Sequence, residues 1–141
     1  LQGQCDPLQL LFPDGSLDLV EQLYQHAPAA QVMNRWVQQT IAEAVNNLPN
    51  GRQIRILEIG AGTGGTTAQI LPSLPAAQTE YWFTDVSRLM TARAEQKFHN
   101  YPFVRYGVLD IEQDPQSQGF ASQQFDIVLA ANVLHATADL Q

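Results

Sequence analysis

The stretch Ile54-Arg55-Ile56-Leu57-Glu58-Ile59-Gly60-Ala61-Gly62-Thr63-Gly64-Gly65 decides the fold of this chain. Its apolar first half predicts a buried strand over residues 54–59, and its glycines predict a tight turn before a helix over residues 66–71. Gly60, Gly62 and Gly64 leave out side chains where a ligand can approach the main chain. The same letters also satisfy the dinucleotide pattern G-x-G-x-x-G. Two cofactor classes therefore compete for this loop, and its glycines alone do not decide between them.

Length, composition and charge narrow the class of protein. At 141 residues, with 45% hydrophobic and 15% charged residues, the chain is long enough for one domain with a core and does not have the composition of a disordered protein. The net charge of −7 and the scattered Lys and Arg argue against a nucleic-acid surface. A negative field is compatible with a cationic small molecule.

Cysteine usage and hydropathy bear on the compartment. Cys5 is the only cysteine, which excludes an intrachain disulfide and a Cys-rich zinc site, so we expect no metal. No apolar run approaches membrane-spanning length, and no signal peptide begins the sequence, so we expect a cytoplasmic protein without membrane contact.

The residues before the glycine loop predict helices. A short helix is predicted to begin at a cap formed by Ser16 or Asp18 and to end at about His26, and a longer helix is predicted to begin at Ala29. The longer helix carries one apolar stripe at three- and four-residue spacing: Val32, Met33, Trp36, Val37, Ile41, Ala44, Val45 and Leu48. This leader either packs onto the domain that follows or forms a lid over a cofactor, with Tyr24 as a wall residue.

After Gly51 short apolar strands alternate with helical segments. Further strands are predicted over residues 80–84, 103–109 and 125–130, and a polar loop over residues 110–122. A helix over residues 87–99 is expected to bury Leu89, Met90, Ala94 and Phe98. Alternation of this kind is typical of an α/β fold with parallel strands, covered by helices.

Glu58 distinguishes the two cofactor classes. A dinucleotide loop presents backbone N–H groups to an anionic pyrophosphate, and a carboxylate there would repel the phosphates by on the order of several kcal/mol. S-adenosylmethionine has no phosphate and carries an ammonium and a sulfonium, so Glu58 favours it. Alternatively, the Glu58 carboxylate bonds the backbone N–H groups that shape the turn, which is compatible with both cofactors.

Acidic residues follow the next two strands. Asp85 ends the second strand, where its carboxylate can accept two hydrogen bonds from a ribose, although an acid there is also a common helix cap. Asp110 follows the third strand and could accept from an adenine amino group, although Asp is frequent in loops. In an open parallel sheet these strand ends face one crevice, which predicts a nucleoside site.

The fourth strand leads into Asn132-Val133-Leu134-His135-Ala136-Thr137. Asn132 stands where the chain leaves the sheet, close to the methionine end of the cofactor. His135 is either structural or a general base, since imidazole is the usual base near neutral pH.

These motifs resemble a known family. Residues 57–65 look like the first motif of class I S-adenosylmethionine-dependent methyltransferases. The segments Tyr81-Trp82-Phe83-Thr84-Asp85-Val86-Ser87 and Asn132-Val133-Leu134-His135-Ala136-Thr137 resemble the C-methyltransferase domains of polyketide synthases. In the leader, Asp6-Pro7-Leu8-Gln9-Leu10-Leu11-Phe12-Pro13 and Glu21-Gln22-Leu23-Tyr24 are similar to the lid of those domains.

The resemblance implies a Rossmann-like class I methyltransferase sheet. Residues 1–50 would be a helical lid segment, and residues 51–141 the N-terminal half of the cofactor-binding domain, with the first four of seven strands. The fourth strand would lie beside the central first strand as an exposed edge, through which the chain by itself could associate. The implied cofactor-binding residues are Glu58, Gly60, Ala61, Gly62, Thr63, Gly64, Asp85, Val86, Leu109, Asp110 and Asn132.

The implied reaction is methylation of the α-carbon of a β-ketoacyl thioester on an acyl carrier protein. His135 would be the catalytic base, paired with a Glu from a later strand that has no counterpart here, so we expect the chain alone to be inactive. Neighbouring synthase domains are the implied partners. Two alternatives are an O- or N-methyltransferase that acts on a small molecule, and a non-catalytic methyltransferase fold that serves as a scaffold.

Overall fold

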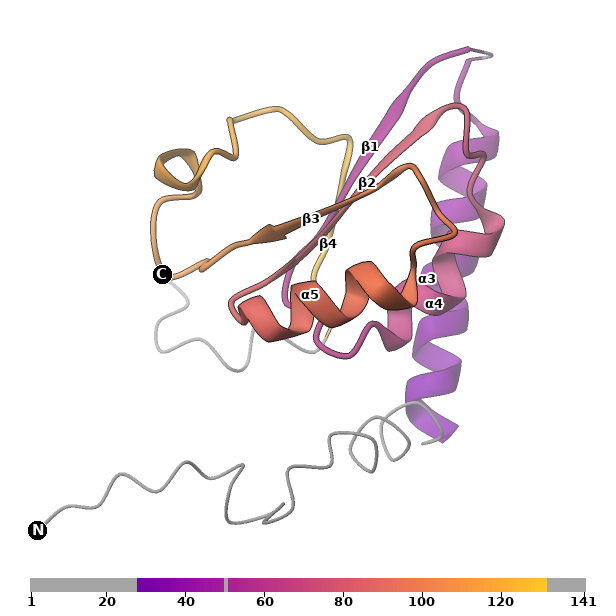
Figure 1. Ribbon diagram of the computed structural model, residues 1–141. Coiled ribbons are helices and arrows are strands. Elements are labelled where there is room, and N and C mark those ends of the chain that lie inside the picture. Colours follow the sequence, from indigo (N-terminus) through magenta and orange to yellow (C-terminus); the bar gives the residue numbers. More distant parts are fainter. Residues whose placement is uncertain (1–27, 50, 132–141) are drawn as a thin grey trace, which may run out of the picture.

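A parallel sheet forms the centre of the molecule. The computed structural model describes residues 28–49 and 51–131, and within these ranges the strands form one sheet in the order β3-β2-β1-β4 (Figure 1). The strands are β1 (Ile54–Glu58), β2 (Thr79–Asp85), β3 (Val104–Val108) and β4 (Ile127–Leu129), and all neighbours are parallel. The predicted α/β, Rossmann-like architecture with β4 beside a central β1 is therefore confirmed.

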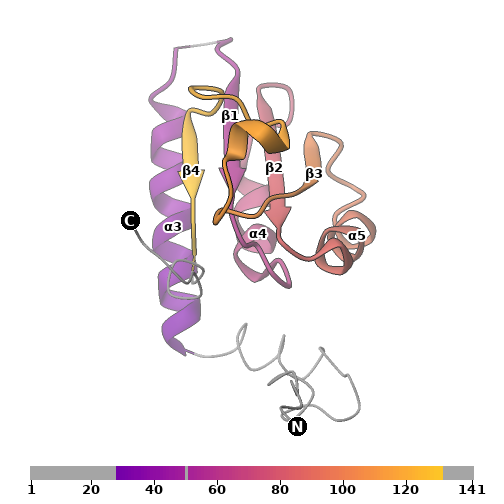
Figure 2. The ribbon, with the colours of Figure 1, turned by 90° about the vertical axis from the view of Figure 1, so that its left-hand side faces the viewer.

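The two faces of the sheet are covered differently. Helices α3 (Pro28–Asn46), α4 (Gly65–Ile70) and α5 (Arg88–Lys97) lie on one face, as does the short 3-10 turn η1 (Leu71–Ser73) (Figure 1). The connection from β3 to β4, which contains the 3-10 turn η2 (Pro115–Gln118), crosses the other face (Figure 2). The chain thus leaves β1 toward β2 and β3 and returns to β4 on the other side of β1.

The larger core lies between the sheet and its helices. Alternate residues of a strand point to one face, so Ile54 and Ile56 of β1 and Tyr81 and Phe83 of β2 all face the helices. They are almost completely buried together with Ile70 of α4. The remaining buried members of this cluster are Ile41, Leu71, Leu74, Ala94, Phe98, Phe103 and Val104.

A smaller core covers the opposite face. Leu57, Leu109 and Phe120 are buried there, with Trp82 and Phe125 packed against them. The Phe120 ring meets the Trp82 ring edge to face, with centroids 5.5 Å apart. The loop predicted over residues 110–122 is irregular as expected, but the sequence reading missed that Phe120 anchors it to the sheet.

The prediction that helix α3 carries a single buried apolar stripe is wrong in part. Val37, Val45 and Leu48 pack toward the core around buried Ile41, as predicted. Val32, Met33 and Trp36 are instead 49%, 52% and 63% exposed, and Ala44 is exposed as well. At about 100° per residue, Val32 lies about 180° around the helix from Ile41, so the spacing combined two opposite faces.

No helix in the described ranges is long and apolar enough to cross a membrane.

The predicted buried face of helix α5 is also wrong at one position. Ala94 and Phe98 are buried as expected, and Met90 is half-buried. Leu89 is 54% exposed, because five residues before Ala94 correspond to about 140° around the helix. Thr91 takes the place on the buried face that was assigned to Leu89.

Candidate functional site

The carboxyl ends of the strands meet at one edge of the sheet. The strand register places Glu58 beside Leu129 of β4, and Asp85 beside Val108 of β3. The chain reverses its direction of winding between β1 and β4, and open α/β sheets bind ligands at such a switch point. The topology therefore has the switch point at which the sequence predicts a crevice.

The glycine loop adopts the tight turn that the sequence predicts, and its glycines serve different purposes. Gly62 has φ +57°, and a Cβ built there meets nothing within 4 Å. Gly64 has φ +76°, and a Cβ there would lie 2.7 Å from the Phe98 ring and 3.4 Å from the Phe83 ring. Gly64 is thus required by packing against the core, whereas Gly62 leaves an open side on which a ligand can approach the backbone.

Three backbone N–H groups of the loop are already bonded within the protein. The Ala61 N–H donates to the Thr84 carbonyl at 2.9 Å, and the Gly64 N–H donates to the Ala61 carbonyl at 3.0 Å. The Gly62 N–H donates to Asp85 Oδ2 at 2.9 Å. A pyrophosphate is held by such N–H groups. Their internal use favours a ligand without phosphates.

Glu58 holds the start of the loop from inside. Its side chain is 1% exposed, and its Oε2 accepts hydrogen bonds from Thr67 Oγ1 at 2.5 Å and from Tyr81 OH at 2.7 Å. The carboxyl therefore joins β1 to α4 and β2 through side-chain hydroxyls. The alternative reading, in which Glu58 bonds backbone N–H groups, identified the structural role but not these partners.

Burial also changes the charge of Glu58. Desolvation, helped by the nearby Asp85 carboxylate and opposed by the two hydrogen bonds, raises the pKa of Glu58 to about 7. The carboxyl is then only partly ionised near neutral pH. A fully ionised Glu58 was assumed when repulsion of phosphates was inferred from the sequence, so that repulsion is weaker than expected. The internal bonding of the loop N–H groups is then the stronger reason to favour S-adenosylmethionine over a dinucleotide.

Asp85 connects the end of β2 to the loop. It is 8% exposed, and its Oδ1 accepts from the Ser87 N–H at 2.8 Å while its Oδ2 binds Gly62. This arrangement is compatible with a helix-capping role for Asp85. It is also compatible with a role as ribose acceptor, because each carboxylate oxygen can accept a further hydrogen bond. Val86, the next residue, is 66% exposed and adds an apolar surface beside it.

The side chains of Leu109 and Asp110, which follow β3, are both engaged within the protein. Leu109 turns its side chain into the smaller core at 3% exposure, so only its backbone could contact a ligand. Asp110 is half-buried, and its carboxylate accepts from the Glu112 N–H at 3.0 Å and from Gln113 Nε2 at 2.8 Å. The carboxylate thus shapes its own loop, as Asp residues in turns do.

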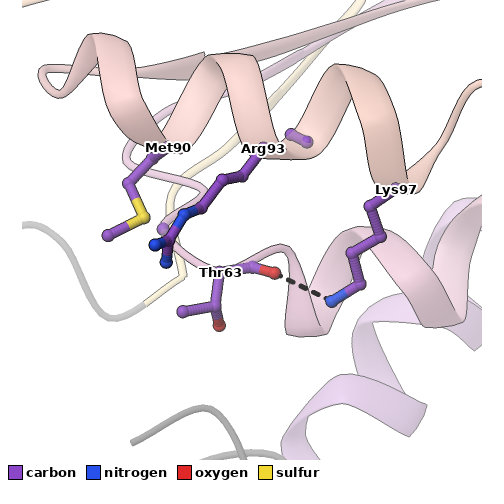
Figure 3. Close-up of a pocket in the computed structure, with 6 residues that line it drawn as sticks. Thr63, Met90, Arg93 and Lys97 are labelled. Carbon is purple, nitrogen blue, oxygen red and sulfur yellow. Dashed lines mark hydrogen bonds between the residues drawn. The ribbon is translucent and has the colours of Figure 1, made fainter. Parts of the chain in front are cut away.

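A small open pocket lies between the loop and α5 (Figure 3). It is lined by Gly62, Thr63, Met90, Arg93, Ala94 and Lys97. The Lys97 ammonium donates to the Thr63 carbonyl at 3.0 Å, which ties the loop to the last turn of α5 (Figure 3). None of the three predicted acids lines this pocket, which shares Gly62 and Thr63 with the glycine loop.

Two predicted site residues lie outside the described ranges, namely Asn132 and His135. The sequence reading also missed residues that hold the loop: Asn34, Thr67, Tyr81 and Lys97. A signal for Asn34 was present, because it is a polar residue on the helical face that carries Ile41. The inward position of Tyr81 could also have been predicted from the sequence, because Tyr81 alternates with Phe83 on a buried strand face.

Comparison with known proteins gives consistent matches. A family model described as a methyltransferase domain matches residues 57–141. The non-reducing polyketide synthase mapC of Penicillium roqueforti is 42% identical over 146 residues, which cover 99% of this chain and 6% of that protein. The polyketide synthase ThaG of Burkholderia thailandensis is 43% identical over 143 residues, or 99% of this chain and 2% of that protein.

Solved structures are similar over almost the whole chain. The CurJ carbon methyltransferase is 54% identical with a TM-score of 0.91, over 99% of this chain and 37% of that one. The citrinin polyketide synthase CMeT domain is 37% identical with a TM-score of 0.85, again over 99% and 37%. The trans-methyltransferase CalH, solved with SAH, is 36% identical with a TM-score of 0.70, over 96% and 36%.

Proposed function

Because this chain belongs to the methyltransferase domain family, we propose that it is part of an S-adenosylmethionine-dependent carbon methyltransferase of a polyketide synthase. Its resemblance to the C-methyltransferase domains of those synthases is confirmed by sequence and structure. The observation that carries the proposal is the likeness to the CurJ carbon methyltransferase, at 54% identity over 99% of the chain.

The residues at the strand ends fit S-adenosylmethionine. Three loop N–H groups are bonded internally, so the loop offers fewer donors for a pyrophosphate. Gly62 leaves its outer side open, and Asp85 retains acceptor capacity for two ribose hydroxyls. The similar CalH structure contains SAH, the form in which this cofactor leaves a methyl transfer.

We assign each predicted residue a role toward the cofactor. Asp85 accepts from the ribose, Val86 packs against the adenine, and Asp110 accepts from the adenine amino group. The backbone of residues 60–64 borders the cofactor, Leu109 contributes main-chain atoms, and Glu58 holds the loop. Asn132 is assigned to the methionine end. When bound, S-adenosylmethionine supplies an electrophilic methyl group on a positively charged sulfur.

The proposed substrate is a β-ketoacyl thioester on an acyl carrier protein. A proton between a ketone and a thioester is acidic enough for removal by imidazole, and we assign this step to His135. Neighbouring synthase domains are the proposed partners, since similar sequences occur inside very large synthases.

This chain accounts for only part of such an enzyme. It spans 6% or less of the curated relatives described above and about 37% of the carbon methyltransferase structures. We propose that residues 1–50 act as the helical lid segment and residues 51–141 as the first half of the cofactor domain, and that activity requires the remainder. A cytoplasmic location stays a prediction.

A methyl-transfer assay on the complete domain tests this function. Wild-type domain, S-adenosylmethionine and a carrier-bound β-ketoacyl substrate should give an α-methylated product by mass spectrometry. His135→Ala should abolish the product and leave cofactor binding nearly unchanged, with His99→Ala, an exposed histidine of the same chain, as the matched control. Near-wild-type turnover by His135→Ala, or methylation on oxygen, would contradict the proposal.

A further inference from the structure

A buried asparagine joins helix α3 to the glycine loop. Asn34 is 7% exposed, although Met33 and Arg35 on either side of it are exposed. Its Oδ1 accepts a hydrogen bond of 2.8 Å from Thr66 Oγ1. A buried polar side chain on the apolar face of a helix is unfavourable unless a specific partner satisfies it, so this contact fixes which part of α3 faces Thr66.

Thr66 lies in the first turn of α4, directly after the glycine loop. Gly64 is the N-cap of this helix, and because glycine has no side chain, no side-chain hydrogen bond caps the helix. The first turn is instead held by two consecutive hydroxyls, because Thr66 binds Asn34 of α3 while Thr67 binds Glu58 of β1. The two bonds attach the first turn of α4 to two different elements, helix α3 and strand β1.

Two further anchors of the loop come from β2 and α5. Gly62 is held by Asp85, and the Thr63 carbonyl is held by Lys97. In the part of the chain that the structure describes, the Asn34–Thr66 bond is the hydrogen bond through which α3 reaches this region. A displacement of α3 would therefore be transmitted to the loop through Thr66.

We propose that Asn34 is a positioning residue, which sets the position of the cofactor loop from helix α3 through the Thr66 hydroxyl. The proposal rests on the proposed function, because it assumes that the loop binds S-adenosylmethionine. Loss of the bond should weaken cofactor affinity by about two- to thirteenfold, the range that corresponds to the net contribution of one hydrogen bond. The catalytic step itself should not change, since neither side chain is assigned a contact with reacting atoms.

The test uses two pairs of variants in the complete domain. Asn34→Ala and Thr66→Val remove the bond, whereas Asn34→Asp and Thr66→Ser keep an acceptor and a hydroxyl. Calorimetric titration with S-adenosylmethionine gives Kd, and steady-state assays separate KM for the cofactor from kcat. Val45→Ala is the matched control, because Val45 packs toward the same core from the other end of α3.

We expect Asn34→Ala and Thr66→Val to raise Kd and KM by similar factors, with kcat within about twofold of wild type. The double variant should be no worse than either single one, and Thr66→Ser should restore affinity. Val45→Ala should lower the unfolding midpoint without raising Kd. Unchanged Kd in both removal variants, additive losses, or an equal rise in Kd for Val45→Ala would overturn the proposal. Failure of the wild-type domain to bind S-adenosylmethionine would refute the proposed function instead.

Discussion

Asp85 Oδ2 accepts a hydrogen bond of 2.9 Å from the backbone N–H of Gly62, and this bond ties the end of β2 to the glycine loop after β1. The other carboxylate oxygen accepts from the Ser87 N–H at 2.8 Å. One side chain thus fixes both the loop and the start of α5. Asp85, which we propose as the ribose acceptor, and the loop are held in register by this bond, which is the pre-organisation that favours tight binding.

Asp85→Asn should therefore damage both the loop and the binding site. The amide retains one acceptor, but its NH2 group must face a backbone N–H, so one partly buried donor loses its partner. We expect about 1–3 kcal/mol of lost stability and at least tenfold weaker binding of S-adenosylmethionine. Urea unfolding and calorimetry on the complete domain measure the two effects, and wild-type values in both would contradict this role for Asp85.

The two middle glycines should respond differently to alanine. Gly62→Ala places a side chain in a left-handed conformation at a cost of about 1–2 kcal/mol, and its methyl group occupies the open side of the loop. Gly64→Ala carries the same strain and also collides with Phe98, which adds about 1–3 kcal/mol. We predict the larger loss of stability for Gly64→Ala and the larger loss of affinity per kcal/mol of destabilisation for Gly62→Ala. The reverse order would show that the loop is packed differently.

Glu58 should make stability depend on pH. Its pKa is raised from 4.5 to about 7 by burial, so between these values the folded state binds a proton that the unfolded state does not. The associated stability is fully present below about pH 4.5 and is lost as pH rises through about 7. Relative to Glu58→Gln, which keeps an acceptor, the wild type should lose on the order of 3 kcal/mol across this window. A difference in unfolding free energy that stays constant with pH would contradict the buried carboxyl.

The fold was predictable because its main signals are local. The run from Ile54 to Ile59 and the glycines after it specify a buried strand and a turn, whatever the rest of the chain does. The faces of α3 were not predictable from spacing alone, since Val32 and Ile41 both satisfy three- and four-residue steps yet lie on opposite sides of the helix. Which apolar face is buried depends on the sheet against which the helix packs.

The site was predictable only as far as residue type and strand position define it. Asp85 was placed correctly at the carboxyl end of β2, where its carboxylate meets Gly62. Glu58 was located correctly, but its charge was not, because burial raises its pKa further than the hydrogen bonds from Thr67 and Tyr81 lower it. Asn34 was missed because its partner, Thr66, is 32 residues away in the sequence.

Strand β4, at one edge of the described sheet, should promote association of the isolated chain. In the described sheet β4 is a terminal strand, and Val128 on it is 59% exposed. An exposed apolar edge strand favours pairing with another chain, and a Lys there opposes it. We expect the 141-residue chain to form dimers or larger species in light scattering, and Val128→Lys to reduce them. A monodisperse monomer at high concentration would contradict this prediction.

The central claim is that the loop and the strand-end acids bind S-adenosylmethionine and not a dinucleotide. Parallel calorimetric titrations of the complete domain with S-adenosylmethionine and with NADPH test it most directly. The account predicts saturable binding of S-adenosylmethionine that Asp85→Asn weakens, and no measurable binding of NADPH. Binding of NADPH at this loop, or equal affinity for both ligands, would contradict it.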